Sequence, residues 1–291
     1  MANGILIIDK PSGWTSNDVV VKLKHVLHEK RIGHAGTLDP MATGVLPVFA
    51  GRATRAAEFA SEGQKEYIAQ IQLGKTTDTQ DSTGIVLTET PGHVTDQQLE
   101  EALSAYRGDI LQIPPMYSAI KVQGRRLYDM ARKGQEVERK PRPVTIHELT
   151  LLEQTGDQCW SLRVRCSKGT YIRTLCHDIG QTLGVGGVMC ALRRTEAAGF
   201  RLDQSVTMDA VINACQSGRE SDLLLPVDTC FMRYPALVIG GRAEHLCRNG
   251  NDFACRSEPG FWRVYNQSGE FLMLGNCQEG RMKTVKSFFP V

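Results

Sequence analysis

The sequence predicts an α+β fold with a mixed or antiparallel sheet, followed by a small β-rich domain. Segments with strand and helix patterns follow one another irregularly, without the repeated β-α-β order that builds a parallel sheet. From about Tyr234 the chain changes to short apolar stretches, ALVIGG, FWRVY and FLMLGNC, with Gly and Asn between them. We therefore expect one domain at residues 1–230 and a second at residues 235–291.

Two strands and one helix are expected near the start. GILIIDK predicts a short buried strand, Ile5–Ile8, which ends at the turn residues behind it. Ser16 or Asn17 then caps a helix. The apolar side of that helix carries Val19, Val20, Leu23, Val26 and Leu27. Apolar and polar residues alternate from Tyr67 to Leu73, which predicts a half-buried strand.

The middle of the chain predicts a helix, a hairpin and a second helix. Thr95 begins a helix that runs to Tyr106, with the acidic first turn that a helix dipole favours. Val144–Leu152 and Trp160–Cys166 predict the two strands of a hairpin. CSKGTYIRTLCHDIGQTLG then passes from strand into helix near Gly169.

A basic segment, residues 113–143, precedes this hairpin and both begins and ends near Pro. It contains eight Lys/Arg and three Asp/Glu, a local charge of +5 on a chain whose net charge is +2. Such a concentration of positive charge indicates contact with a polyanion, although a solvated helix face has the same composition. The prolines at its ends indicate an insertion that departs from the main body.

The composition excludes several classes of protein. The chain is 41% hydrophobic and 23% charged, as folded soluble proteins are. No apolar run reaches the ~18 residues of a membrane span, and the N-terminal residues lack the pattern of a signal peptide. The nine cysteines are odd in number and none has C-x-x-C spacing, which indicates reduced thiols in the cytoplasm and no structural zinc.

Three attractive motifs fail on their spacing. Gly74-Lys75-Thr76 resembles the end of a phosphate-binding loop, but Ala69 stands where that loop requires Gly. Asp78, Asp81 and Gly84 lack the spacing of a calcium loop. No Ser or Cys has the G-x-S-x-G setting of a hydrolase nucleophile.

GHAGTLDPMATG, residues 33–44, holds one carboxylate, Asp39, in a turn-prone loop. An isolated Leu-Asp-Pro is usually a turn or cap. Here the glycines at positions 33, 36 and 44 permit close approach of a backbone or ligand, and Pro40 favours an extended Asp39. The apolar run Val45–Ala50 anchors the loop. These features predict an exposed, rigidly held carboxylate, but they name no reaction.

Six segments, in family order across residues 4–230, resemble the motifs of the TruB-type tRNA pseudouridine synthases. GHAGTLDPMATGVLPV resembles the catalytic motif and GILIIDKPSGWTSND the N-terminal motif. KEYIAQIQLGKTTDTQDSTG resembles the central Tyr strand, and CSKGTYIRTLCHDIG the Arg motif. PPMYSAIKVQGRRLYDMARKG is similar to the family's inserted thumb, and LRRTEAAGF to the segment that closes the pocket. The region after residue 235 is similar to a PUA-type RNA-binding domain in length, position and β-rich texture.

The resemblance implies a stand-alone tRNA pseudouridine(55) synthase of bacterial type, acting on the T-arm by base flipping and without a cofactor. Asp39 would labilise the N-glycosidic bond; attack on the sugar, attack on the base and removal of a sugar proton all stay open. Tyr67 matches the Tyr that stacks on the base and could take the C5 proton. Arg173 matches the Arg that would keep the carboxylate ionised inside a pocket.

The same resemblance implies the residues that bind substrate. His34 matches the His that enters the RNA loop as the bases leave, and Tyr171 and Leu192 match residues that line the base pocket. Lys10, in the N-terminal motif, is also expected to bind substrate. The candidate phosphate contacts of the basic segment are Lys121, Arg125, Arg126, Arg132 and Lys133.

Three other functions are compatible with parts of the sequence. A related enzyme that works inside a guide-RNA particle would generally lack the basic insertion. An RNA-binding or tRNA-folding protein would not require Asp39, Tyr67 and Arg173 together. A glycoside hydrolase would need a paired acid near Asp39, and none is found. The expected partner is therefore tRNA, with no membrane, no obligatory protein partner and a monomeric state.

Overall fold

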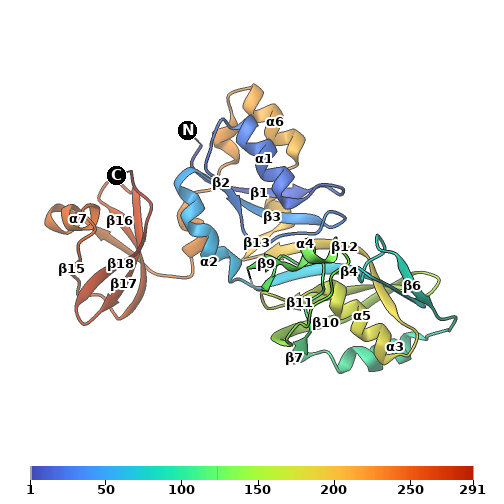
Figure 1. The fold of residues 1–291 in the computed structure, drawn as a ribbon. Coiled ribbons are helices and arrows are strands. Elements are labelled where there is room, and N and C mark those ends of the chain that lie inside the picture. The colour runs from blue at the N-terminus through green and yellow to red at the C-terminus, as the bar shows by residue number, and fades with distance from the viewer. Residues whose placement is uncertain (1, 123, 291) are drawn as a thin grey trace. The chain divides into compact units, whose positions relative to one another are not determined.

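The computed structural model describes residues 2–122 and 124–290 of the chain. Contacts divide it into two compact units, whose elements are shown in Figure 1. The first unit comprises residues 1–40, 45–62 and 203–291, and the second comprises residues 41–44 and 63–202. The domain division expected from the sequence, between residues 230 and 235, stays a prediction.

The first unit begins with a small sheet and one long helix. Its elements up to residue 62 are β1 (Gly4–Lys10), α1 (Ser16–Val26), β2 (Ile32–His34), β3 (Thr43–Ala50), the 3-10 helix η1 (Gly51–Ala56) and α2 (Ala57–Ser61). β3 has both β1 and β2 as neighbours, and β2 pairs with it antiparallel, Gly33 opposite Phe49. The predicted strand Ile5–Ile8 is confirmed and extends through Lys10.

α1 begins one or two residues earlier than the sequence predicts. Thr15 is the N-cap, and its side chain accepts from the backbone N–H of Asp18 while the Asp18 carboxylate accepts from the Thr15 N–H. This reciprocal pair is a capping box, which satisfies two N–H groups that the first turn leaves unpaired. The expectation that Ser16 or Asn17 caps the helix is therefore wrong.

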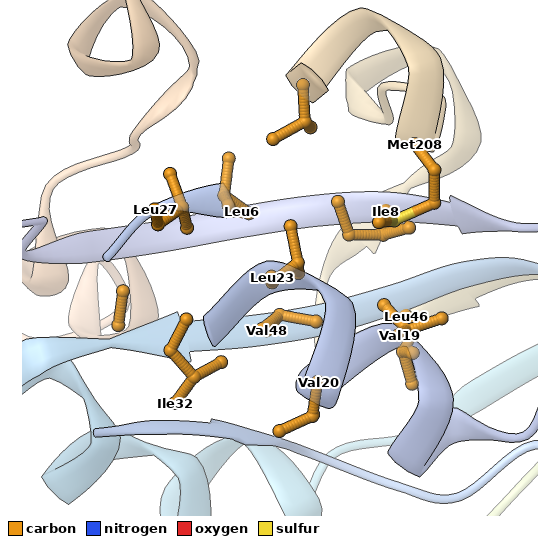
Figure 2. Packing of buried hydrophobic residues seen from close by; sticks show 12 residues of the cluster. Leu6, Ile8, Val19, Val20, Leu23, Leu27, Ile32, Leu46, Val48 and Met208 are labelled. Atoms are coloured by element: carbon orange, nitrogen blue, oxygen red, sulfur yellow. The ribbon is translucent and has the colours of Figure 1, made fainter. Parts of the chain in front are cut away.

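The core of the first unit joins α1 to β1, β3 and α6 (Met208–Gln216). Leu23 of α1, Leu6 of β1 and Met208 of α6 belong to one cluster of buried apolar side chains (Figure 2). Complete burial of a Leu or Ile side chain contributes about 1.5–3 kcal/mol. Since the Asp39 loop follows β2 and leads into β3, this core fixes both of the strands that carry the loop.

The second unit is a sheet with helices and an inserted segment. Its elements are β4 (Lys65–Leu73), β5 (Lys75–Thr77), β6 (Val86–Glu89), α3 (Asp96–Ser104), β7 (Gly108–Gln112), β8 (Lys121–Val122), β9 (Arg125–Arg126), α4 (Leu127–Ala131), β10 (Arg142–Gly156), β11 (Cys159–Cys166), α5 (Ile172–Thr182), β12 (Gly187–Ala197) and β13 (Phe200–Arg201), with the 3-10 helix η2 (Leu202–Gln204) at its end. Its main strands follow the order β12-β4-β11-β10-β7 with antiparallel pairs. Thr43 and Gly44, the start of β3, pair with β12 in parallel. The sheet is therefore mixed, as the sequence predicts.

The strongest sequence patterns of this unit are confirmed. β4 buries every second residue from Lys65 to Leu73, as its alternation predicts. β10 and β11 form the predicted hairpin, and α3 begins after the Thr95 cap but ends at Ser104 rather than Tyr106. β12 was not expected, although it lies beside β4 in the sheet.

The C-terminal part of the first unit contains a second sheet with its own core. After α6 come the 3-10 helices η3 (Glu220–Leu223) and η4 (Val227–Phe231), then β14 (Ala236–Ile239), α7 (Gly241–Arg248), β15 (Phe253–Ala254), β16 (Gly260–Asn266), β17 (Phe271–Gln278) and β18 (Arg281–Ser287). The strand order is β14-β16-β17-β18-β15. Buried Val264, Leu272 and Met282 belong to its apolar cluster. The predicted β-rich texture of this region is confirmed.

None of the helices among the described residues is both long enough and apolar enough to cross a membrane. Within residues 2–122 and 124–290, no three His, Cys, Asp or Glu side chains gather in a group that could bind a metal ion. All nine cysteines are free thiols.

Candidate active site

Asp39 lies in the loop between β2 and β3, and the residues on both sides of it are held by hydrogen bonds. The Leu38 N–H donates to Ser16 Oγ over 2.9 Å, and the Ser16 hydroxyl donates to the Leu38 carbonyl over 3.2 Å. The Pro40 carbonyl accepts from the Gly13 N–H over 2.9 Å. Asp39 is half-buried rather than exposed. The rigid backbone expected around this carboxylate is therefore present.

Lys10 also holds this loop, through a hydrogen bond to Pro40. Its side chain is fully buried, and the ammonium donates to the carbonyls of Pro11, Trp14 and Pro40 over 2.9, 2.6 and 3.2 Å. A buried charge is tolerated only where hydrogen bonds replace its hydration, as these three carbonyls do. Lys10 thereby ties the turn after β1 to the residue that follows Asp39. Its expected contact with substrate stays a prediction.

Two of the loop glycines have positive φ angles. Gly36 has φ +81° and Gly44 has φ +101°, a region that favours Gly. A Cβ at Gly44 would lie 2.2 Å from the carbonyl oxygen of Arg194, so β12 approaches the chain closely here. A Cβ at Gly33 would meet nothing within 4 Å. Close approach of another backbone thus explains Gly44 but not Gly33.

Tyr67 and Leu192 lie on neighbouring strands of the second unit. Tyr67 of β4 is 6% exposed and Leu192 of β12 is 8% exposed. In the register of these strands, Leu192 is opposite Ala69 and Arg194 is opposite Tyr67. The arrangement places a phenol, an aliphatic side chain and a fully buried guanidinium group on two adjacent strands.

Arg173 stands in the first turn of α5 and is 5% exposed. Its two terminal nitrogens donate to the carbonyl of Thr79 over 3.2 Å and to the carbonyl of Tyr117 over 2.9 Å. Its Nε lies 3.9 Å from Asp81 Oδ2. The guanidinium therefore joins the loop after β5 to the start of the basic segment.

Asp81 is oriented by donors from its own loop. Its side chain is buried, and Oδ1 accepts from Thr79 Oγ1 over 2.8 Å, from the Thr83 N–H over 2.9 Å and from Thr83 Oγ1 over 2.6 Å. With Oδ1 fixed by three donors, Oδ2 is the oxygen nearer Arg173. A buried ion pair with additional hydrogen bonds has a defined geometry, and removal of one partner is strongly destabilising.

Tyr171 is the N-cap residue of α5 but has no capping side chain. Buried Gln112 holds its backbone instead: the Gln112 amide oxygen accepts from the Tyr171 N–H over 3.0 Å, and the amide nitrogen donates to the Tyr171 carbonyl over 3.3 Å. Gln112 ends β7, immediately before the basic segment. The backbone of Tyr171 is therefore fixed by an element far from it in the sequence.

The basic segment presents a cationic cavity of about 770 Å³. The lining includes Lys121, Arg125, Arg126, Arg132 and Lys133, all exposed, together with Gly124, Asp129, Met130 and Gln135. The guanidinium groups of Arg126 and Arg132 lie 5.7 and 5.6 Å from the ring centre of Tyr128. Cation–π contacts of this kind hold two charges beside one ring. Nη1 of Arg126 also donates to the Tyr128 hydroxyl over 2.7 Å, which further fixes this guanidinium beside the ring.

His34 ends β2, where it pairs with Val48 and is half-buried. His34, Lys10 and Asp39 thus belong to the first unit, whereas Tyr67, Tyr171, Arg173, Leu192 and the cations of the basic segment belong to the second. Within each unit the structure brings the expected residues onto joined elements. The expected contact between Arg173 and Asp39 stays a prediction.

Three residues of these surroundings were missed or misjudged in the sequence. The sequence predicts Ser16 as a cap, yet its hydroxyl holds the loop. The sequence relates Asp81 only to a calcium loop, which its spacing rules out, and relates Arg194 only to one family motif. The signals were weak, because each of these residues depends on a partner distant in sequence.

The second unit combines groups suited to chemistry on a planar ring. A buried phenol can stack on a base or accept a proton, and a buried guanidinium can stabilise negative charge. In the first unit, the carboxylate between two fixed residues can serve as a nucleophile or base.

Two family models match the chain. A model described as the N-terminal domain of the TruB family of pseudouridylate synthases matches residues 24–172. A model described as the C-terminal domain of tRNA pseudouridylate synthase B matches residues 173–232.

Curated relatives match nearly the whole chain. The tRNA pseudouridine synthase B of Stutzerimonas stutzeri (strain A1501) is 43% identical over 282 residues, which cover 95% of this chain and 92% of that protein. The protein of the same name from Clostridium kluyveri is 38% identical and covers 98% of this chain and 99% of its own length. Among solved structures, a chain from a Cbf5–Nop10–Gar1 complex has a TM-score of 0.76 and 26% identity, covering 99% of this chain and 85% of that chain.

Proposed function

Because the chain belongs to the TruB family of pseudouridylate synthases, we propose that it converts uridine 55 in the T-arm of tRNA to pseudouridine. In this isomerisation the bond between N1 and the sugar C1′ breaks, a bond between C5 and C1′ forms, C5 loses a proton and N1 gains one. No atom is added or removed overall. The observation that carries the proposal is the Asp39 loop, fixed through Leu38 and Pro40 within a family-matched sequence.

We assign the chemical steps to three residues. Asp39 labilises the glycosidic bond, as a nucleophile or as a base. Tyr67 stacks on the detached uracil and takes the C5 proton. Arg173 stabilises the carboxylate and the charge that develops on the base. The reaction requires no cofactor, because the carboxylate, the phenol and the guanidinium supply the groups that it needs.

Substrate binding is divided between the base and the RNA backbone. The target base must leave its stack, which costs a few kcal/mol, and His34, Tyr171 and Leu192 are assigned to the space it leaves and the pocket it enters. The five cations of the basic segment bind phosphates and position the RNA without reading its sequence. The β-rich region from residue 235 is assigned as a PUA-like RNA-binding domain.

We further propose that the enzyme acts in the cytoplasm as a monomer, with tRNA as its partner and no obligatory protein partner. The solved relative was crystallised as a Cbf5–Nop10–Gar1 complex, so dependence on partner proteins is the alternative. The cationic cavity of the basic segment favours the stand-alone form, because it gives the chain its own means of gripping RNA.

The test is tritium release from a tRNA transcript labelled at uridine C5, with purified protein and no other component. Wild type is expected to release one equivalent per tRNA. Asp39→Asn is expected to release none while binding tRNA within a few-fold of wild type. Asp209→Asn, which alters an exposed acid on α6, is the matched control and should behave as wild type. Near-normal release by Asp39→Asn would refute the assigned role.

A further inference from the structure

A second cationic cavity lies at the C-terminal end of α1. Its volume is about 420 Å³, and its lining is Lys24, His25, His28, Glu29 and Lys30. The two lysines and the two histidines are exposed. Among the residues that the structure describes, none forms an ion pair or hydrogen bond with the ammonium of Lys24 or Lys30. Both charges are therefore open to a ligand.

Glu29, the one acid in the lining, is turned to the protein. Its side chain is buried, and its Oε1 accepts from the backbone N–H of Arg31 over 2.9 Å. The carboxylate thereby fixes the turn between α1 and β2. The side chains that remain at the surface of this turn, including that of exposed Arg31, are cationic or carry N–H donors.

His28 occupies a backbone position that histidine rarely takes. It follows Leu27, the C-cap of α1, and has φ +49°. Helices usually place Gly or Asn at this left-handed position, and another residue there costs about 1–2 kcal/mol. The ring centre of His28 lies 6.4 Å from that of His25. Two imidazoles and two ammonium groups thus surround one space. Position 28 carries His even though Gly would adopt this backbone conformation at a lower cost in free energy.

The cavity is separated from the catalytic loop by the length of α1. Ser16, at the start of the helix, contacts Leu38 beside the catalytic Asp39. At a rise of 1.5 Å per residue, the helix Ser16–Val26 spans about 16 Å. A strand of B-form DNA advances about 3.4 Å along its axis per phosphate and an A-form RNA strand advances less, so this distance corresponds to roughly five or six nucleotides of RNA. One bound RNA is therefore long enough to contact both the cavity and the Asp39 loop.

We propose that Lys24, His25, His28 and Lys30 form a second phosphate-binding site for the substrate tRNA. The site contacts the RNA backbone about 16 Å from the catalytic loop and reads no bases. The proposal that the bound polyanion is tRNA rests on the proposed function. The histidines donate hydrogen bonds to phosphate oxygens, and the lysines supply the charge that displaces counterions from the RNA.

The test is the affinity of full-length tRNA transcript for Lys24→Glu and Lys30→Glu, measured over a range of KCl concentrations. Each variant is expected to weaken binding about three- to ten-fold and to reduce the slope of log K against log salt by about one. Arg219→Glu reverses an exposed cation of the first unit that lies outside the cavity and is the control. The control should bind tRNA with the wild-type slope.

The catalytic readout separates this proposal from the assignment of the reaction. At saturating tRNA, both lysine variants are expected to form pseudouridine at the wild-type rate, because neither residue touches the reacting atoms. If Lys30→Glu weakens tRNA binding but the wild-type protein forms no pseudouridine, the proposed reaction is refuted and the proposed phosphate site is supported. Active wild type, with both lysine variants binding as Arg219→Glu does, would refute the site. Lys30→Arg keeps the positive charge and should bind tRNA as wild type does. If a Glu variant fails to fold, the neutral variants Lys24→Gln and Lys30→Gln are measured in its place.

Discussion

The Ser16→Ala substitution removes a single oxygen atom that holds the Asp39 loop. Ser16 Oγ accepts from the Leu38 N–H and donates to the Leu38 carbonyl, at 2.9 and 3.2 Å. Ser16 is 1% exposed and Leu38 is 3% exposed, so water cannot readily replace the lost partner. Asp39 is the next residue in the chain, and we expect its carboxylate to lose its fixed position.

The size of the effect follows from the two groups left unpaired. A buried polar group without a partner costs about 1–3 kcal/mol, and Ala recovers about 0.5 kcal/mol through its higher helix propensity. We therefore expect the free energy of unfolding to fall by about 1.5–5.5 kcal/mol. Misplacement of a catalytic group by about 1 Å can cost a hundredfold in rate, and we expect pseudouridine formation to slow by about 10- to 100-fold.

The matched control is Thr15→Ala, one residue earlier. It removes the N-cap of the same helix, which costs about 0.5–2 kcal/mol. Within the described part of the chain, Thr15 forms its hydrogen bonds with Asp18 and Val19 of the helix and none with the Asp39 loop. Urea unfolding gives the stability of both variants, and tritium release in a single turnover gives their rates. If Ser16→Ala forms pseudouridine as fast as Thr15→Ala, the loop does not depend on this hydroxyl and the reasoning fails.

Two further substitutions test buried carboxyl groups. Asp81→Asn should misalign Arg173 and lower the single-turnover rate by about 10- to 100-fold; an unchanged rate would show that the pair is only structural. Burial raises the pKa of Asp178 from its ordinary 3.8 to about 6, so the folded protein loses stability as the pH rises from about 4 through 6. Asp178→Asn should therefore raise Tm at neutral pH, with a gain that vanishes toward pH 4 in thermal unfolding scans; the same gain at both pH values would contradict this cause.

Local patterns were sufficient for the elements whose burial follows their periodicity. β4 alternates along its whole length, and the sequence predicts it to within two residues at its start. α3 has its cap, its acidic first turn and its apolar spacing in one short segment. The polar turn residues between β10 and β11 mark their hairpin. In each case the residues that determine the structure are neighbours in the chain.

The missed features depend on partners that no local pattern contains. β12 carries Arg193 and Arg194, charges that indicate a solvated segment, yet Arg194 is fully buried in the sheet. Asp81 has its place beside Arg173 only after α5 packs near the loop that follows β5. Thr15 and Ser16 are both residue types that cap helices well. Thr15 is the cap because the Ser16 hydroxyl is hydrogen-bonded to the backbone of Leu38, which is distant in sequence.

The bond between Arg173 and the Tyr117 carbonyl makes the basic segment and the candidate active site parts of one thermodynamic system. Tyr117 lies at the start of that segment, and its hydroxyl also donates to Asp78 over 3.4 Å, in the loop that supplies Asp81. A conformation of the segment that moves the Tyr117 carbonyl must change the acceptors available to the guanidinium. By linkage, any RNA that favours one conformation of the segment also favours one arrangement around Arg173. A uracil or analogue that stabilises this arrangement must then raise the affinity of the segment for RNA, by the same factor by which the RNA raises the affinity for the uracil.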